Sequence, residues 1–502
     1  MTNKPSIPQG TRDFSAEVVR KRNYIFAIIR NIFELYSFEP LETPAMENLD
    51  TLMGKYGEEG DKLIYRILDS GNPFSKEFFR ELGDYFKANY DNIENLRISC
   101  DEFKDISNPF GNALFKLNPE ALESFSMQLL KNKKYLTGFK NEVSDKALKY
   151  DLTIPFARYV AMNHTKLTFP FRRYQIQPVW RADRPQKGRY REFTQCDADV
   201  VGSLSLLNEV ELANIYHEVF IKLGLIKYEL KINSRKILVA LAALCGGADK
   251  MIDITIAIDK LDKIGLEKVK EELQQRGLND EQIKTIESYL NITGTNEEKL
   301  TQIKSLIGSI EIGKQGIEEV EFLFLQTKNT NLHIDFTLAR GLNYYTGIIF
   351  EAKAPPAVKM GSIGGGGRYD NLTGLFGVPN IPGVGISFGV DRIFDVLEEL
   401  NLFPQDVQTS TEALFFNMGE NESNFAFGIM QNLRSSGIAC ELYHEAAKIS
   451  KQFSYAEKKN IPFVIIIGSK EIEEQNCAVK NLASGTQEIV QFEKLADYFN
   501  NL

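Results

Sequence analysis

Residues 178–200, PVWRADRPQKGRYREFTQCDADV, decide how the rest of this chain is interpreted. The segment carries five cations within eleven residues, and it then turns acidic at Asp197 and Asp199. Its pattern predicts a strand, a basic loop at Pro185 and Gly188, and a second strand. Guanidinium groups match phosphate oxygens two at a time and never lose their charge. The segment therefore predicts a cleft for a polyphosphate beside a small cation. A solvated charged hairpin is the alternative, and the aromatic residues that flank the charges argue against it.

Three further segments of the chain carry recognisable motifs. They are LKYDLTIPFARYVAMN (148–163), LARGLNYYTGIIFEA (338–352) and GVGISFGVDRI (383–393). Together with residues 178–200, they resemble the class II aminoacyl-tRNA synthetases and, among these, the histidyl-tRNA synthetase family. The basic segment resembles motif 2, residues 383–393 resemble motif 3, and residues 338–352 resemble a sequence peculiar to the histidine enzymes. Residues 148–163 resemble the histidine-binding loop in its eukaryotic and archaeal form.

The resemblance implies an α+β fold, with a class II synthetase catalytic domain on an antiparallel sheet, helical insertions and a C-terminal α/β anticodon-binding domain. Residues 17–36 have apolar positions at helical spacing and resemble the motif 1 helix of a dimer interface. After residue 404 the pattern reads βαβαββ, which predicts a small, mainly parallel sheet with helices on both faces. The expected domains are the catalytic domain in two parts (1–233 and 331–403), a helical insertion domain (234–330) and the anticodon-binding domain (410–502).

Residues 72–146 depart from the family pattern. In typical relatives, the equivalent of GEEGDKLIYRILD runs within a few residues into the equivalent of ALKYDLTIP, whereas here a long insert separates them. The insert has enough Phe, Leu and Tyr to pack. We interpret it as a lineage-specific surface subdomain, with a contact to tRNA or to a partner subunit as the alternative.

The activity that the resemblance implies is histidine–tRNA ligation. L-histidine reacts with ATP to give histidyl-adenylate and pyrophosphate, and histidine then passes to the 3′ end of tRNA(His). The implied partners are tRNA(His), L-histidine, ATP with Mg²⁺, and a second copy of the chain in a homodimer. The first step needs no protein nucleophile, because the substrate carboxylate attacks phosphorus. It needs alignment and charge stabilisation, which arginines supply.

The resemblance also assigns the ATP-binding residues. Arg181 matches the motif 2 arginine that holds the α-phosphate and the substrate carboxylate. Arg189 and Arg191 match loop arginines nearer the β- and γ-phosphates. Phe193 matches the aromatic residue that stacks on adenine, and Arg392 matches the motif 3 arginine.

Arg340 is the distinctive residue of the segment 338–352. In the family, an arginine at this place reaches the α-phosphate from the side opposite Arg181, where other class II enzymes use a metal ion. Arg181 and Arg340 are therefore the expected catalytic residues, and both also belong to the expected histidine site. Asn343 stands where relatives usually carry aspartate, which removes a carboxylate from the pocket wall while keeping an acceptor oxygen.

Histidine recognition needs acceptors for an imidazole N–H and for an ammonium group. Asp199 and Tyr345 match the imidazole-binding pair. Asp151, Thr153 and Gln195 match the group near the α-amino end, and Asp151 could also cap a helix. Tyr344 is either a contact or a packing residue.

The segment GSIGGGGRYDNLTGLFG (361–377) resembles a second family signature that lines the histidine pocket. Glycines permit positive φ and a close approach of backbone to ligand. As a bare glycine run, the same segment would indicate a hairpin turn.

Composition narrows the remaining function classes. The net charge of −9 argues against nucleic-acid binding through bulk charge, so RNA would be held by local patches. No apolar run of about 20 residues predicts a membrane span, and no signal peptide is recognised. Five scattered cysteines and four separated histidines predict neither a disulfide framework nor a dedicated metal cluster, and they favour a cytoplasmic location. The two basic patches are residues 181–191 and the series Lys448, Lys451, Lys458, Lys459 and Lys470.

Three alternatives remain open. A regulatory paralogue that senses histidine without charging tRNA tends to lose the Arg340 segment or the C-terminal domain, and this chain keeps both. A class II synthetase for another amino acid lacks the pattern L-x-R-G-L-x-Y-Y. A pure RNA-binding protein would explain the basic loop but not the acidic pocket residues.

Overall fold

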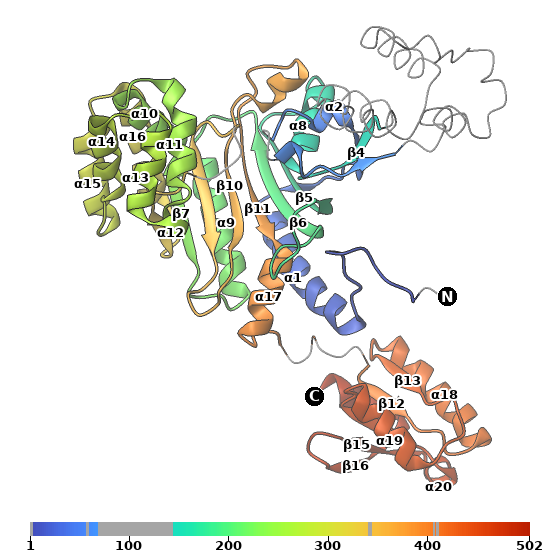
Figure 1. The fold of residues 1–502 in the computed structure, drawn as a ribbon. Helices are drawn as coiled ribbons and strands as arrows, with labels where there is room; N and C mark the ends of the chain where they lie inside the picture. The colour runs from blue at the N-terminus through green and yellow to red at the C-terminus, as the bar shows by residue number, and fades with distance from the viewer. Residues whose placement is uncertain (1–3, 57–59, 69–143, 340–343, 405–406, 408–410) are drawn as a thin grey trace, which may run out of the picture. The chain divides into compact units, whose positions relative to one another are not determined.

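The computed structural model describes residues 4–56, 60–68, 144–339, 344–404, 407 and 411–502. Its contacts divide the chain into two compact units. The first unit comprises residues 1–12 and 29–395, and the second comprises residues 13–28 and 396–502. Figure 1 follows the chain through both units.

An eight-stranded sheet forms the frame of the first unit in the described part of the chain, in the order β1-β5-β6-β11-β10-β9-β7-β8. Neighbouring strands are antiparallel except at the two edges, where β1 with β5 and β7 with β8 are parallel. The predicted antiparallel sheet is therefore confirmed. Its strands are β1 (Glu39–Pro40), β5 (Phe171–Trp180), β6 (Glu192–Val201), β7 (Glu229–Ser234), β8 (Leu332–Ile334), β9 (Ile348–Lys353), β10 (Ser362–Arg368) and β11 (Gly383–Gly389).

The predicted strand, basic loop and second strand are confirmed as β5, residues 181–191 and β6. The two strands pair antiparallel from Phe171 opposite Val201 to Trp180 opposite Glu192. Successive side chains of a strand point to opposite faces of the sheet. In β6 the apolar set of Cys196, Ala198 and Val200 is therefore buried on one face, while the polar set that alternates with it faces the other side.

Helices cover the apolar face of this sheet. The ring of Phe388 in β11 lies 4.7 Å from the ring of Tyr216 and 5.6 Å from that of Phe220, measured between centroids. Both residues belong to α9 (Leu207–Lys222). From the helix α1 (Ala16–Leu35), Phe33 packs on the same Phe388 ring at 5.9 Å. This cluster of buried aromatic rings leaves the opposite, polar face of the sheet available for a site.

The glycine-rich segment forms a strand rather than a hairpin turn. Residues 362–368 are β10, and Gly364, Gly365, Gly366 and Gly367 are absent from the residues with positive φ in the described chain. A Cβ on Gly366 would lie 2.2 Å from the carbonyl oxygen of Gly385 in the adjacent strand. Close approach between strands, rather than unusual φ, explains the requirement for glycine here.

The first unit also contains a smaller sheet of three strands. The strands β2 (Met46–Asn48), β4 (Lys146–Leu148) and β3 (Arg66–Ile67) pair in that order, and α2 (Leu49–Leu52) follows β2. Helix α8 (Thr153–Asn163) packs against the 3₁₀ helix η3 (Leu372–Phe376). Its apolar side buries Ile154, Phe156 and Val160.

Between β7 and β8 the chain is helical, as the period of residues 234–330 predicts. Helices α14 and α15 each begin with a capping box, at Asn279 with Gln282 and at Thr295 with Glu298. Tyr289 ties this region to the sheet, because its hydroxyl donates to the carbonyl of Phe336 at 2.7 Å. The helices are α10 (Arg235–Leu244), α11 (Met251–Ile258), α12 (Leu261–Ile264), α13 (Leu266–Gln275), α14 (Asp280–Leu290), α15 (Asn296–Ile307) and α16 (Glu311–Gln326), with the 3₁₀ turn η2 (Ala248–Lys250).

The second unit contains a five-stranded sheet in the described residues, in the order β13-β12-β14-β15-β16. The pairs that involve β12 are parallel, whereas β14 with β15 and β15 with β16 are antiparallel. The sheet is therefore mixed, and the prediction of a mainly parallel sheet is wrong. The elements are β12 (Ala413–Phe415), α18 (Glu420–Ser435), β13 (Cys440–Leu442), α19 (Ile449–Lys458), β14 (Phe463–Ile466), α20 (Ser469–Glu473), β15 (Asn476–Asn481), β16 (Gln487–Gln491), the 3₁₀ turn η5 (Phe492–Lys494) and α21 (Leu495–Asn500), with α17 (Val390–Glu399) preceding them.

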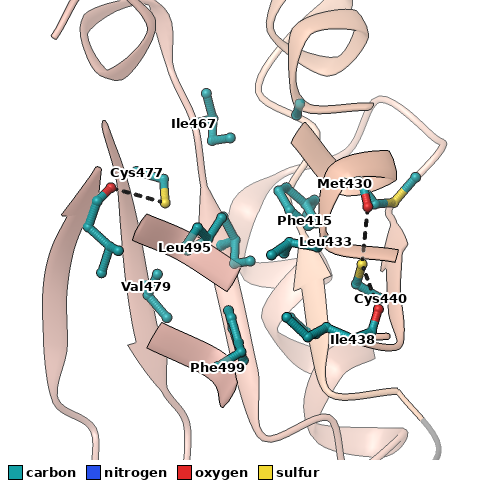
Figure 2. Close-up of a cluster of buried hydrophobic side chains, with 14 of the residues drawn as sticks. Phe415, Met430, Leu433, Ile438, Cys440, Ile467, Cys477, Val479, Leu495 and Phe499 are labelled. Carbon is teal, nitrogen blue, oxygen red and sulfur yellow. Dashed lines mark hydrogen bonds between the residues drawn. The ribbon is translucent and has the colours of Figure 1, made fainter. Parts of the chain in front are cut away.

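Apolar side chains from the strands and helices pack together on one side of this second sheet. Figure 2 shows Phe415 of β12 and Val479 of β15 meeting Leu433 of α18 and Phe499 of α21. The C-terminal α/β fold is thus confirmed, although the pattern did not reveal the short helices α20 and α21. In the described part of the chain, no helix has the length and apolar character that crossing a membrane requires.

Candidate active site

A pocket of about 350 Å³ opens on the polar face of the large sheet. Strands β6, β9, β10 and β11 form its floor, while the 181–191 loop and the starts of α8 and α17 form its walls. Nine of the residues singled out in the sequence line it. They are Asp151, Thr153, Arg181, Arg189, Phe193, Gln195, Tyr344, Tyr345 and Arg392.

One side of the pocket is strongly cationic, because Arg181, Arg189 and Arg392 all line it. Backbone carbonyls hold Arg392 in place: its Nε donates to Gly188 at 2.6 Å and its Nη1 to Ser362 at 2.6 Å. Burial lowers the pKa of Arg392, and the cations Arg189 and Arg181 lower it further. The three guanidinium groups repel one another, so an anion placed among them would be stabilised.

Arg181 lies where the cationic side meets the rest of the pocket. Its Nε donates to the carbonyl of Tyr150 at 3.0 Å. Its guanidinium lies 4.3 Å from the ring centroid of Tyr150 and 5.1 Å from that of Phe193. These two ring contacts restrict the movement of the guanidinium group, a group that can bind oxygens two at a time.

Asp151 contributes a hydrogen-bond acceptor to the lining of the pocket. Its Oδ1 accepts hydrogen bonds from the hydroxyl of Tyr56 at 2.9 Å and from the amide of Ile154 at 3.2 Å, so it also supports the first turn of α8. In the described structure its buried Oδ2 has no hydrogen-bond partner. Burial raises the pKa of Asp151, and these hydrogen bonds together with Arg181 oppose the rise.

Gln195 provides a second acceptor. Its Nε2 donates to the hydroxyl of Ser387 at 2.9 Å, which leaves its Oε1 buried and, among the described residues, without a partner. Buried oxygens without partners are costly unless a ligand satisfies them. Asp151 and Gln195 thus mark a site for a group with several N–H donors.

Aromatic side chains bound the space between these two sides. The ring centroids of Tyr344 and Tyr345 are 5.1 Å apart, and the ring planes are inclined at 67°. Thr153 reaches Tyr344 through a side-chain hydrogen bond. Burial raises the pKa of Tyr345, and Asp151, Asp199 and Asp197 raise it further, so its hydroxyl remains protonated. A planar ligand with a hydrogen-bond acceptor would fit against such a wall.

Asp199 is not among the residues that line the pocket, and its contact with an imidazole stays a prediction. Its carboxylate pairs with Arg173 at 2.8 Å and accepts a hydrogen bond from the hydroxyl of Tyr369. The side chains of Arg173 and Asp199 are 0% and 3% exposed. Arg173 and Tyr369 are thus partners of this carboxylate, and its charge raises the pKa of Tyr345.

Arg191, which was predicted to lie near the β- and γ-phosphates, contacts backbone carbonyls. It is not among the residues that line the pocket. Its Nε donates to the carbonyl of Asp183 at 3.2 Å and its Nη1 to that of Gln9 at 3.2 Å. Two backbone carbonyls thus bind Nε and Nη1 of this guanidinium group, and its contact with a phosphate stays a prediction. Arg340 and Asn343 lie outside the described residues, as does most of the insert 72–146.

Sequence reasoning missed several residues of the pocket. Ser387 lines the pocket because the strand register places it directly opposite both Asp197 and Gly365. Glu351 and Asp391 supply carboxylates to the pocket wall. The two-residue alternation of GVGISFG was a usable signal for Ser387, whereas Glu351 required knowledge of strand pairing.

No cluster of three or more His, Cys, Asp or Glu side chains suited to a metal occurs among the described residues. Two of the pocket carboxylates have cationic partners: Glu351 pairs with Lys353 at 3.1 Å, and Asp391 pairs with Arg12. Separately, in the C-terminal unit, the lysine series is exposed, and Lys459 pairs with Glu441 at 2.9 Å.

Asp197 should make stability depend on pH. Burial raises its pKa to about 7, Asp199 and Asp151 raise it, and Arg173 and a hydrogen bond from Ser387 oppose the rise. A raised pKa in the folded state means that the neutral acid is favoured there. The stabilisation is complete below the unfolded-state pKa and is lost progressively as the pH rises to the folded-state value of about 7. Asp197→Asn should therefore raise the thermal unfolding midpoint more at pH 8 than at pH 5.

Thermal unfolding of the variant and of the unmodified protein at both pH values provides the measurement. Asp50→Asn, at an exposed position in α2, is the matched control and should give parallel curves. Parallel curves for Asp197→Asn as well would contradict the expectation.

Known proteins resemble this chain over its whole length. The model of the family described as histidyl-tRNA synthetase matches residues 120–393, and that of an anticodon-binding domain matches residues 412–502. The chain is 49% identical over 500 residues to a histidine–tRNA ligase of Flavobacterium johnsoniae and 50% identical over 499 residues to one of Bacteroides fragilis. Both alignments cover 99% of each chain. The crystal structure of histidyl-tRNA synthetase from Nostoc sp. PCC 7120 matches with a TM-score of 0.76 at 29% identity, covering 100% of both chains.

Proposed function

Because this chain belongs to the histidyl-tRNA synthetase family, we propose that the pocket on its large sheet joins histidine to ATP. The activity of the chain is histidine–tRNA ligation, with histidine, ATP and tRNA(His) as substrates. One observation carries the assignment of the site. Three arginines and two buried acceptors without partners in the described structure, Asp151 Oδ2 and Gln195 Oε1, line the same pocket.

Histidine would lie with its ammonium group at these acceptors. A carboxylate and an amide oxygen satisfy two of the three ammonium protons, and the Thr153 hydroxyl is the candidate for the third. The imidazole would lie against Tyr345, whose hydroxyl stays protonated in the field of Asp199 and Asp197. Tyr344 would close the same wall. An amino acid that lacks the imidazole N–H and acceptor would leave these polar groups unpaired and would bind less well.

ATP would occupy the cationic side. Arg181 would bind both the histidine carboxylate and the α-phosphate, which aligns the attacking oxygen with phosphorus. Arg189 and Arg392 would hold the remaining phosphates, and Phe193 would stack on adenine. The preorganised guanidinium groups would stabilise the negative charge that develops on the phosphate in the transition state, which lowers the barrier. The carboxylate of histidine is itself the nucleophile, so the protein needs no covalent intermediate.

Two further residues belong to the proposal on the strength of the family resemblance. Arg340 is proposed as the second catalytic arginine, opposite Arg181. Arg191 is proposed to support the loop that carries Arg189, because carbonyls hold its guanidinium group outside the pocket. Mg²⁺ is proposed to arrive with ATP and to neutralise phosphate charge, with Glu351 as its candidate protein ligand, since Mg²⁺ is usually held by one or two carboxylates plus phosphates.

Several finer features are proposed as well. The domain boundaries at residues 233, 330 and 403, a homodimer formed through α1, a cytoplasmic location and the eukaryotic-like form of residues 148–163 all rest on the resemblance. The insert 72–146 falls within alignments that cover 99% of relatives from two genera, which supports a subdomain common to this lineage. A monomeric mass by light scattering at micromolar concentration would contradict the homodimer.

Pyrophosphate exchange tests the function. The purified full-length protein is incubated with ATP, Mg²⁺ and labelled pyrophosphate, with each of the twenty amino acids in turn. Exchange with histidine alone is expected. If the folded protein binds histidine but catalyses no exchange, the result favours a regulatory paralogue. If exchange occurs with another amino acid, the result favours a class II synthetase for that amino acid.

A further inference from the structure

The N-terminal segment Pro8–Arg12 lies against the 181–191 loop of the first unit. It makes a turn in which the amide of Thr11 donates to the carbonyl of Pro8 at 3.1 Å. The amide of Arg191 donates to the carbonyl of Gly10 at 2.8 Å. Gly10 has φ +87°, and a Cβ there would lie 2.8 Å from the side chain of Arg191 and 2.9 Å from that of Pro185. Only glycine lets the segment lie this close to the loop.

The side chain of Arg12 extends from this segment to Tyr190 and Asp391, which both line the pocket. Its guanidinium carbon lies 3.3 Å from the ring centroid of Tyr190, which is a stacked cation–π contact. Its Nη2 also forms an ion pair with Asp391 at the start of α17. The hydroxyl of Tyr190 in turn donates to Asp395 at 2.8 Å. Arg12 therefore connects the loop that carries Arg189 to the helix that carries Arg392.

The partner of Arg12 is a carboxylate that lines the pocket. The side chain of Asp391 is 2% exposed, that of Arg12 is 26% exposed, and Asp391 Oδ2 accepts a hydrogen bond from the amide of Thr194 at 2.9 Å. Asp391 is the immediate neighbour of Arg392 in the chain. If its charge were not compensated, this buried carboxylate would repel the phosphates of a bound nucleotide and compete for Arg392.

We propose that Arg12 is a positioning residue for ATP. It compensates the charge of Asp391, and it holds the loop and α17 so that Arg189 and Arg392 face the same phosphates. Arg12 itself lies outside the pocket lining and acts through Asp391 and Tyr190. This inference rests on the proposed function for the identity of the nucleotide, and it adds an N-terminal residue to the ATP side of the site.

The test separates the two substrates. Kinetics of pyrophosphate exchange are measured with the full-length protein and its Arg12→Gln variant. We expect the KM for ATP to rise about tenfold, in line with the coupling energies measured between interacting residues. We expect the KM for histidine to change by less than about twofold, because no histidine contact involves Arg12.

Two further variants distinguish charge from fold. Arg12→Lys keeps the cation and should recover most of the ATP affinity. In the double variant with Arg12→Gln and Asp391→Asn, the uncompensated charge is gone, so its KM for ATP should be below that of Arg12→Gln alone. Arg276→Gln is the matched control, because this arginine pairs with Asp253 and Glu272 in the helical region and does not line the pocket. It should leave both KM values unchanged.

Direct titration calorimetry with ATP keeps this inference separate from the proposed function. Weaker ATP binding by Arg12→Gln supports the role of Arg12 even if no amino acid supports exchange. The inference is overturned if Arg12→Gln binds ATP as the unmodified protein does. It is also overturned if the KM values for ATP and histidine rise by the same factor, which would indicate a general loss of structure.

Discussion

Replacement of Arg181 by alanine is expected to lower kcat for histidine-dependent pyrophosphate exchange about 10²- to 10³-fold. Arg181 is the residue that our account places between the two substrates, at the junction of the cationic side and the acceptor side of the pocket. Its contacts with Tyr150 and Phe193 restrict the guanidinium group in advance, so little reorganisation is expected when charge develops at the α-phosphate. The loss should therefore appear mainly in kcat.

Two further variants sharpen this expectation. Arg181→Lys keeps the charge but cannot present two parallel N–H donors, so its activity should stay close to that of Arg181→Ala. Arg184→Ala removes an exposed arginine of the same loop that does not line the pocket, and it should retain near-normal kcat. Near-normal kcat in Arg181→Ala would exclude Arg181 from the transition state.

Replacement of Asp151 by asparagine is expected to raise the KM for histidine about 10- to 100-fold, with little change in the KM for ATP. Asparagine keeps an oxygen that can accept from Ile154 and Tyr56, so the first turn of α8 should persist. The second oxygen, which has no partner in the described structure, becomes an NH₂ group that cannot accept from an ammonium group. The expected effect is large because hydrogen bonds between an ammonium group and a carboxylate are stronger than those between neutral groups.

The control for Asp151→Asn is Tyr56→Phe. That variant removes the hydroxyl that donates to Oδ1 and leaves Oδ2 unchanged, so its KM for histidine should rise by much less. Both KM values are obtained from pyrophosphate exchange, and thermal unfolding shows whether the variants fold. If Asp151→Asn raises the KM for ATP as much as that for histidine, Asp151 supports the fold and does not select the amino acid.

The strand, loop and strand around the basic segment could be predicted from sequence because the information is local. Apolar and polar residues alternate in β6, and Pro185 and Gly188 mark the loop between the strands. The family resemblance then brought together residues as distant as Asp151 and Arg392, which do line one pocket. Their chemical roles remain proposals that the experiments above address.

What the sequence did not reveal depends on pairing between distant segments. Ser387 orients Gln195 only because the register of β6 and β11 brings them together. The guanidinium group of Arg191 donates to carbonyls of Gln9 and Asp183, and Gln9 lies far from it in the chain. The C-terminal sheet is mixed because β14, β15 and β16 pair as antiparallel neighbours, which alternation of strands and helices does not encode.

The most direct test of the central claim is an experimental structure of the protein with histidine and a non-hydrolysable ATP analogue. The histidine ammonium nitrogen is expected to lie about 3 Å from Asp151 Oδ2 and from Gln195 Oε1. Arg181 is expected to contact both the histidine carboxylate and the α-phosphate. Histidine bound outside this pocket, or bound with its imidazole at Asp151 and its ammonium group elsewhere, would contradict the account.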